Sequence, residues 1–222
     1  MYTYLCMVCS GDTINFLKEP LDKGVLLSYN VRVQIQRMNK SENIMVRFQK
    51  FWKEVLKLPY KPNSQDNPLH ELQVMALLQK YKFEFEYQPN GDQQSPDFRV
   101  TLDDGKKVDI ECKSSKQPYP TYNGGLPKEG VVYIFSSKRY NETTVYFAED
   151  IVTDKKREQF SNLIEELNVV LKKHQGNPDW EDPRGLDFYI RNMYVQNGAG
   201  KKDYFKHSDR QRCENNVLNY KW

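Results

Sequence analysis

Alternation of apolar and polar residues predicts a β-hairpin near the middle of the chain, from Ser95 to Lys116. The turn sequence Asp-Asp-Gly occupies positions 103–105, between two runs in which every second residue is apolar. Side chains two residues apart in a strand project to the same side, so these apolar positions should face a core. They are Phe98, Val100 and Leu102 before the turn, and Val108, Ile110 and Cys112 after it.

The opposite side of the second strand carries charge, because Asp109, Glu111 and Lys113 alternate with its apolar residues. Such a row is typical of the solvated face of a half-buried sheet. Antiparallel pairing about the turn, however, places the position opposite Asp97 near residue 112. The hairpin is therefore expected to bring Asp97 close to Glu111 and Lys113.

Two carboxylates and an ammonium group at one point are suited to phosphodiester hydrolysis. Carboxylate oxygens bind divalent cations such as Mg²⁺, and a lysine can orient a water molecule, help to deprotonate it, or stabilise charge on a phosphate. The sequence predicts Asp97 and Glu111 as metal ligands and Lys113 as the residue that positions or activates water.

Pro96-Asp97, followed after thirteen intervening residues by Glu111-Cys112-Lys113, resembles the PD-(D/E)xK signature of a nuclease superfamily that includes many type II restriction endonucleases. The resemblance covers about residues 67–150. It implies a restriction-endonuclease-like core, Mg²⁺ with Mn²⁺ as a substitute, and products with 5′-phosphate and 3′-hydroxyl ends. It also implies double-stranded DNA as substrate, a homodimer, and a cognate DNA methyltransferase as a functional partner.

Helical and strand patterns fill the rest of the chain. Asn67-Pro68 is expected to open a helix with Leu72, Met75, Ala76 and Leu78 on its apolar face. Glu71, at the edge of that face, is either carried toward the sheet, as a further catalytic carboxylate that the resemblance implies, or stabilises the first helical turn. Further helices are expected from Ser41 to Pro59 and from Thr153 or Asp154 to Gly176, the latter packed across the sheet, and strands at 31–36, 83–88, 131–136, 143–147 and 186–195.

Three polar regions are candidates for contact with DNA: the loop after Lys113, the loop at 136–141, and the basic segment 198–222. The first is alternatively a lid or a simple connector, the second an ordinary exposed hairpin loop, and the third a partly disordered tail. The residues expected to bind DNA are Lys116, Gln117, Tyr122 and Asn123, then Lys138 and Arg139, and finally Lys201, Lys202 and Arg210.

Composition fits a single globular domain, since 222 residues with 38% hydrophobic content can bury one core. That core is expected at about 67–195, with residues 1–60 and 196–222 as elaborations for DNA binding or dimerisation. A net charge of +3 neither requires nor excludes nucleic acid. Four cysteines form no disulfide framework, and no signal peptide or membrane span is evident, which indicates a reducing cytoplasm. The resemblance to restriction endonucleases implies that this cytoplasm is prokaryotic.

The sequence thus predicts an α/β fold, with a mixed central β-sheet flanked by the helices that begin near residues 67 and 154. The predicted function is that of a Mg²⁺-dependent, sequence-specific endodeoxyribonuclease. Two alternatives stay open: a structure-selective or repair nuclease of the same superfamily, which reads DNA shape, and a noncatalytic DNA-binding protein with a chance motif.

Overall fold

The computed structural model describes residues 3–10, 13–20, 43–64, 68–92, 94–196 and 209–222. The chain divides into two units, Met1–Arg32 and Val33–Trp222. In the first unit, strands β1 (Thr3–Ser10) and β2 (Thr13–Pro20) pair antiparallel. The strand predicted at 31–36, the cap at Ser41 and the cap at Asn67 lie outside the described residues.

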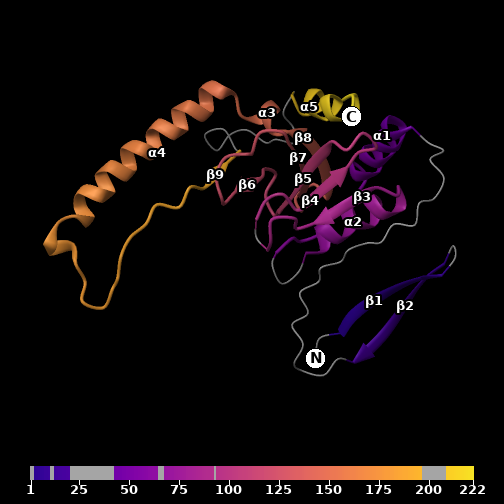
Figure 1. Cartoon of the computed structure of the whole chain (residues 1–222), viewed down its shortest axis with the longest axis horizontal. Helices are drawn as coiled ribbons and strands as arrows, with labels where there is room; N and C mark the ends of the chain where they lie inside the picture. The colour runs from indigo at the N-terminus through magenta and orange to yellow at the C-terminus, as the bar shows by residue number, and fades with distance from the viewer. Residues whose placement is uncertain (1–2, 11–12, 21–42, 65–67, 93, 197–208) are drawn as a thin grey trace. The chain divides into compact units, whose positions relative to one another are not determined.

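A five-stranded mixed sheet organises the second unit (Figure 1). Its order is β3-β4-β5-β7-β8, and only the β5–β7 pair is parallel. The sheet confirms the predicted α/β class. The apolar strand that begins at Val131 is buried inside the sheet as predicted, but it lies next to the edge strand and not at the centre. The strands are β3 (Glu84–Tyr87), β4 (Phe98–Thr101), β5 (Lys107–Ser115), β7 (Val131–Ser137) and β8 (Glu142–Phe147).

Strands β4 and β5 form the predicted hairpin. Phe98 pairs with Ile110, and the turn uses Gly105 at a φ of 84°, a conformation that glycine adopts without steric cost. Continued by one residue, this register sets Asp97 opposite Glu111, one position from the expected 112. The hairpin therefore delivers Asp97 to the charged face of β5.

One face of the sheet packs on the main hydrophobic core, to which three helices contribute. These are α1 (Ile44–Val55), α2 (Leu69–Lys80) and α5 (Arg210–Leu218). The core extends beyond the expected 67–195, because aromatic residues before it and after it pack together: the rings of Phe48 and Trp222 stack at 4.7 Å. Buried members of this core include Phe48, Phe51, Trp52, Val55, Val74, Leu78, Phe98, Val100, Ile110, Ile134, Val145 and Val217.

Helix α2 turns a different side to the sheet from the one predicted. Leu72 is 46% exposed, whereas His70, Glu71, Val74 and Leu78 are buried. Leucine and methionine occur all round this helix, so apolar spacing did not select a face. The result is that Glu71 lies on the buried side.

Helix α4 (Asp154–Gln175) corrects a second prediction. It begins as expected, with the Thr153 side chain accepting from the Lys156 backbone N–H, and it ends at Gly176. It does not pack across the sheet, however, because none of its residues is buried. The helix next to the sheet on the C-terminal side is α5, whose Glu214 accepts a hydrogen bond from Thr144 of β8 at 2.7 Å.

The strand predicted at 186–195 is also wrong over most of its length. Two short helices flank α4: α3 (Ala148–Ile151) precedes it and η1 (Pro178–Trp180) follows it. Within residues 186–195, only β9 (Tyr194–Val195) is extended and paired, and its partner is β6 (Thr121–Tyr122). Leu186 is 79% exposed, so the alternating pattern there found no sheet face to cover it. Within the described ranges, no helix combines the length and apolar composition needed to cross a membrane.

Candidate active site

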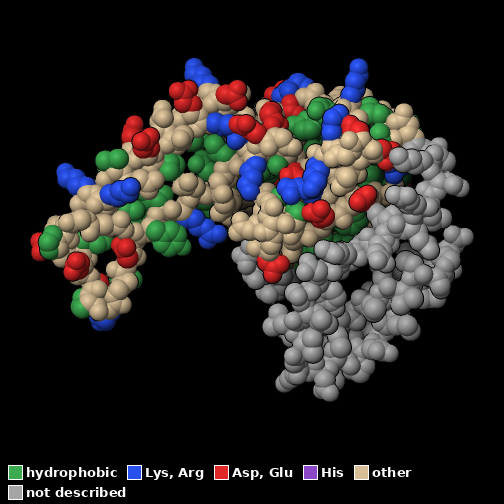
Figure 2. All heavy atoms as spheres, viewed as in Figure 1, with side chains coloured by type: hydrophobic (Ala, Val, Ile, Leu, Met, Phe, Trp, Pro, Cys, Tyr) green, Lys and Arg blue, Asp and Glu red, His purple; other side chains and the backbone are tan. Residues whose placement is uncertain are grey.

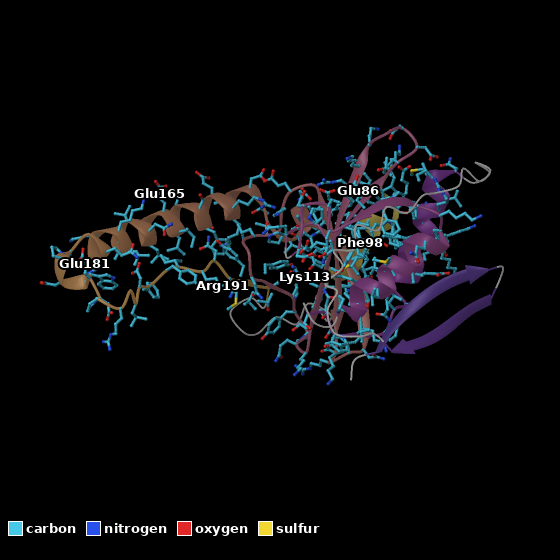
Figure 3. All side chains as sticks on the ribbon, turned by 60° about the horizontal axis from the view of Figure 1, so that its bottom comes forward. Glu86, Phe98, Lys113, Glu165, Glu181 and Arg191 are labelled. Atoms are coloured by element: carbon cyan, nitrogen blue, oxygen red, sulfur yellow. The ribbon has the colours of Figure 1, made fainter. Side chains whose placement is uncertain are left out.

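The structure brings Asp97, Glu111 and Lys113 together beside the β4–β5 hairpin. Asp97 directly precedes β4, and its Oδ2 accepts a hydrogen bond from the Cys112 backbone N–H at 2.6 Å. Lys113 Nζ donates to Glu111 Oε1 at 2.5 Å. Figure 3 labels Lys113 on β5 and Phe98 on the neighbouring strand, the residue that follows Asp97. The predicted convergence of these three side chains is thus present.

Glu71 joins the same region from the first turn of α2. Its Oε1 accepts from Asn63 Nδ2 at 2.7 Å, and its Oε2 accepts from the Tyr87 hydroxyl at 2.6 Å. The residue is only 7% exposed, so its carboxylate lies against β3 and not in bulk water. Of the two alternatives for Glu71, this geometry favours the carboxylate directed toward the sheet.

Burial, followed by repulsion from the neighbouring carboxylates, raises the pKa of Asp97. Burial, reinforced by the negative charges of Glu111 and Glu71, raises the pKa of Asp97 to about 8, although the Cys112 N–H and Lys113 act in the opposite direction. Asp97 therefore holds a proton near neutral pH. That proton compensates part of the negative charge that the site concentrates.

The pKa of Lys113 is also raised, but for a lysine a raised pKa favours the charged form. Burial alone would lower its pKa, but attraction and a hydrogen bond to Glu111, together with the charge of Asp97, outweigh burial and raise the pKa above the usual value. The ammonium group is therefore charged at neutral pH. This favours a role in orienting groups and stabilising negative charge, and argues against Lys113 as the base that removes a proton from water.

One buried oxygen of the cluster has no partner. Glu111 is 6% exposed, and its Oε2 makes no hydrogen bond within the described structure. Buried carboxylate oxygens are rarely left unpaired, because the desolvation cost is high. Release of the proton from Asp97 would leave three carboxylates beside one ammonium group, an excess of negative charge. A divalent cation fits both the unpaired oxygen and this charge.

The donor set suits Mg²⁺ better than a cation that needs a closed protein cage. Among the described residues, no group of three or more His, Cys, Asp or Glu side chains is arranged to hold a metal ion. Both Glu71 oxygens are already bound, which leaves Asp97 and Glu111 as the candidate ligands. Mg²⁺ is commonly held by one or two carboxylates together with water and substrate phosphate.

Asp109 shares the charged face of β5 but belongs to a different interaction. Its two oxygens accept from Arg99 Nε at 2.7 Å and from Arg99 Nη2 at 2.9 Å. A carboxylate held in this bidentate way is already neutralised. Asp109 therefore braces the hairpin, and Asp97 is the carboxylate that faces Glu111.

Four of the predicted DNA-binding residues lie just beyond the C-terminal ends of strands β5 and β7. The parallel strands β5 and β7 end side by side, since Ser115 pairs with Ser137 and the Lys138 N–H donates to the Ser115 carbonyl at 2.9 Å. The residues that follow these ends are exposed and polar. They are Lys116 and Gln117 after β5, and Lys138 and Arg139 after β7.

Other predicted contact residues lie elsewhere. Tyr122 is 4% exposed, and its hydroxyl forms hydrogen bonds with the Tyr146 hydroxyl (2.9 Å) and with Gln196 Oε1 (2.8 Å), so it lies in the protein interior and not on the surface where DNA was expected to bind. Arg210 binds Glu142 and Glu214, each at 2.8 Å, and holds α5 to β8. Asn123 is exposed, and Lys201 and Lys202 lie outside the described residues.

Two residues of the site were not predicted from the sequence. Asn63 lies in an irregular stretch without a motif, so no pattern pointed to it. Tyr87 stood within the expected strand at 83–88, and its alternation with Glu86 showed only that one of the two faces the sheet interior.

Comparisons with protein-family models, with curated proteins and with solved structures found no match.

Proposed function

We propose that this protein is a Mg²⁺-dependent endodeoxyribonuclease that hydrolyses phosphodiester bonds of double-stranded DNA at specific sequences, as type II restriction enzymes do. The observation that carries the proposal is the convergence of Asp97, Glu111 and Lys113 across the β4–β5 hairpin, with an unpaired, buried Glu111 oxygen.

Each side chain then has a distinct task. Asp97 and Glu111 would hold the cation, and Asp97 gives up its proton when it does so. Lys113 stays protonated and donates to an oxygen of the reacting phosphate or of the attacking water. Asn63 and Tyr87 orient the Glu71 carboxylate, which lies beside the two proposed ligands and can contribute to the attraction of a cation. When bound, the cation supplies charge neutralisation at the phosphate and makes water more acidic.

The substrate is proposed from the surface beside the site. Lys116 lies three residues, or roughly 10 Å, beyond Lys113 in the direction of β5. Lys138 follows the neighbouring strand β7, whose end pairs with that of β5. Lysine and arginine at this distance can bind neighbouring phosphates of the same strand, and glutamine and arginine can also bind base edges. A nucleic-acid substrate is thus supported by the exposed residues that follow these strand ends: Lys116, Gln117, Lys138 and Arg139.

Digestion of plasmid DNA of known sequence in the presence of Mg²⁺ tests the proposal. Discrete fragments that share one end sequence are expected, and chelation of the metal should stop cleavage. Cutting confined to junctions, flaps or mismatches would instead identify a structure-selective nuclease.

Substitutions assign the site. Asp97→Ala and Lys113→Ala should each reduce cleavage by at least a hundredfold while DNA binding persists. Asp109→Asn is the matched control, because it alters a carboxylate on the same strand face that Arg99 already neutralises. Undiminished cleavage by Lys113→Ala would remove the assigned site.

A further inference from the structure

Arg157 carries a largely covered guanidinium group with few hydrogen-bond partners. It lies at the end of the first turn of α4, and its side chain is 19% exposed. Its buried Nε and Nη2 atoms form no hydrogen bond within the described structure. Buried N–H donors are normally satisfied by an acceptor, because desolvating them without one is unfavourable. Arg157 therefore lacks the acceptors that its burial calls for.

An acidic side chain lies against this guanidinium group. Glu129 Oε1 is 3.2 Å from Arg157 Nε, without the alignment of a hydrogen bond, and the Glu129 side chain is 67% exposed. Exposed ion pairs contribute little free energy, because water screens them, so Glu129 can leave Arg157 at small cost. Figure 2 shows one face of the molecule, on which Lys and Arg side chains lie among Asp and Glu side chains. An anion that binds such a basic group must replace an acidic neighbour.

The residues around Glu129 connect Arg157 to the carboxylate cluster. The backbone N–H of Lys128 donates to the Tyr133 hydroxyl at 2.9 Å. Tyr133 pairs with Glu111 across the parallel strands β5 and β7, and directly paired residues of neighbouring strands project their side chains to the same side. The segment that carries Glu129 is therefore fixed beside Glu111, one of the two proposed metal ligands.

The charges near the Tyr133 hydroxyl agree with this placement. Burial raises the pKa of Tyr133, and the hydrogen bond from the Lys128 N–H acts against burial. Glu111 and Asp97 raise this pKa further, whereas Arg157 lowers it. The carboxylates and the guanidinium group are thus close enough to act on one hydroxyl.

A phosphate of nucleic acid fits Arg157 better than the Glu129 carboxylate does. The planar guanidinium group presents N–H donors that can pair with two oxygens of one phosphate, whereas Glu129 satisfies neither Nε nor Nη2. Exchange of one anion for the other leaves Arg157 neutralised in both states. A cation beside the site also offsets the repulsion between the carboxylate cluster and the DNA backbone.

We propose that Arg157 binds a phosphate of the DNA backbone beside the cleaved bond, and that Glu129 occupies this position until DNA displaces it. The inference rests on the proposed function for the identity of the anion. Arg157 then holds substrate and takes no part in bond cleavage, so its loss should affect DNA binding more than the rate at saturating DNA.

Fluorescence anisotropy of a labelled duplex with the mapped cut site, in a chelating buffer, measures DNA binding without cleavage. Arg157→Gln should weaken binding about five- to twentyfold and lower the slope of log Kd against log salt concentration by about 0.9, the value for one lost phosphate contact. With Mg²⁺ present, KM should rise by a similar factor while kcat stays within about twofold. Lys106→Gln is the matched control, because Lys106 also pairs with a carboxylate, Asp104 at 2.8 Å, but lies at the hairpin turn. It should change Kd by less than about twofold.

Replacement of Glu129 should act in the opposite direction. Glu129→Gln should tighten DNA binding about two- to fivefold, because the phosphate no longer has to displace a carboxylate. It should have no effect once Arg157 is replaced, since the two residues act as a pair. Asp104→Asn makes the same charge change at the hairpin turn and should leave Kd within about twofold. Glu129 is exposed, so its variant tests the exchange independently of how Arg157→Gln folds.

Contrary outcomes separate this inference from the proposed function. Equal effects of Arg157→Gln and Lys106→Gln would overturn the role of Arg157 even if the unaltered protein cuts DNA. Tightening by Glu129→Gln that persists without Arg157 would overturn the exchange of anions. If the unaltered protein does not cut DNA at all, the proposed function fails first, and this inference fails with it.

Discussion

Replacing Asp97 by asparagine should make the metal-free protein more stable while it abolishes cleavage. The folded protein raises the pKa of Asp97 from 3.8 to about 8, chiefly through burial and then through repulsion by Glu111 and Glu71. Asparagine carries no charge, and its carbonyl oxygen can still accept the hydrogen bond from the Cys112 N–H. The substitution therefore removes the repulsion and keeps the contact.

The sign of the pH dependence follows from proton binding. Between pH 4 and pH 8 the folded protein holds a proton on Asp97 that the unfolded chain has released, so the stability of the unaltered protein falls as pH rises through this range. Each pH unit contributes about 1.4 kcal/mol. Relative to the unaltered protein, the asparagine variant should gain up to about 4 kcal/mol between pH 5 and pH 8.

Urea unfolding at pH 5, 6, 7 and 8 in a chelating buffer measures the difference directly. Other titrating groups cancel, because both proteins contain them. Asp109→Asn provides the comparison: it breaks an ion pair with Arg99 whose side chains are 23% and 25% exposed, so it should cost about 1 kcal/mol, and this cost should not grow between pH 5 and pH 8. A variant at Asp97 that is less stable than the unaltered protein, by an amount independent of pH, would refute the electrostatic account of the site.

Three further outcomes are expected. Mg²⁺ affinity, measured by calorimetry, should tighten by about tenfold per pH unit from pH 6 to pH 8, because the cation competes with the proton on Asp97, and Glu111→Gln should remove this binding. Burial lowers the pKa of His70 to about 4, so the free energy of unfolding should fall by up to about 3 kcal/mol as pH falls from 6.5 to 4, because the unfolded chain binds a proton that folded His70 does not. Urea unfolding of a His70→Leu variant should lack that pH dependence. Trp52→Ala should lower the unfolding free energy by about 3–5 kcal/mol in the same assay, because Trp52 is fully buried beside Phe48 and Trp222.

The hairpin and its charged face were predictable because their information is local. Turn chemistry at Gly105 and alternation on both sides fix the register to within one residue, and the register alone brings Asp97 to Glu111. The buried strand at Val131 was equally clear from its unbroken apolar run. What these patterns could not supply was the set of partners for Glu71, since Asn63 and Tyr87 reach it from separate segments of the chain.

The errors share a physical cause. An apolar stripe shows that a helix or strand has something to cover, but not what covers it. The stripe of α4 was assigned to the sheet, yet α5, a helix of largely polar composition, takes that place through the bonds of Arg210 and Glu214 to β8. The same bonds explain why Arg210 is not a free basic residue.

The contacts of Asp150 have a consequence for how this protein can vary. Asp150, four residues before α4 begins, binds Arg212 at 3.1 Å and Asn216 at 2.6 Å, both of them in α5. The chain therefore leaves the sheet-and-helix core and rejoins it at nearly the same point. A stretch with both ends fixed together behaves as an insertion, which can change in length or sequence without moving the strands. Evolution or an engineer can thus change α4 while the carboxylate cluster stays intact.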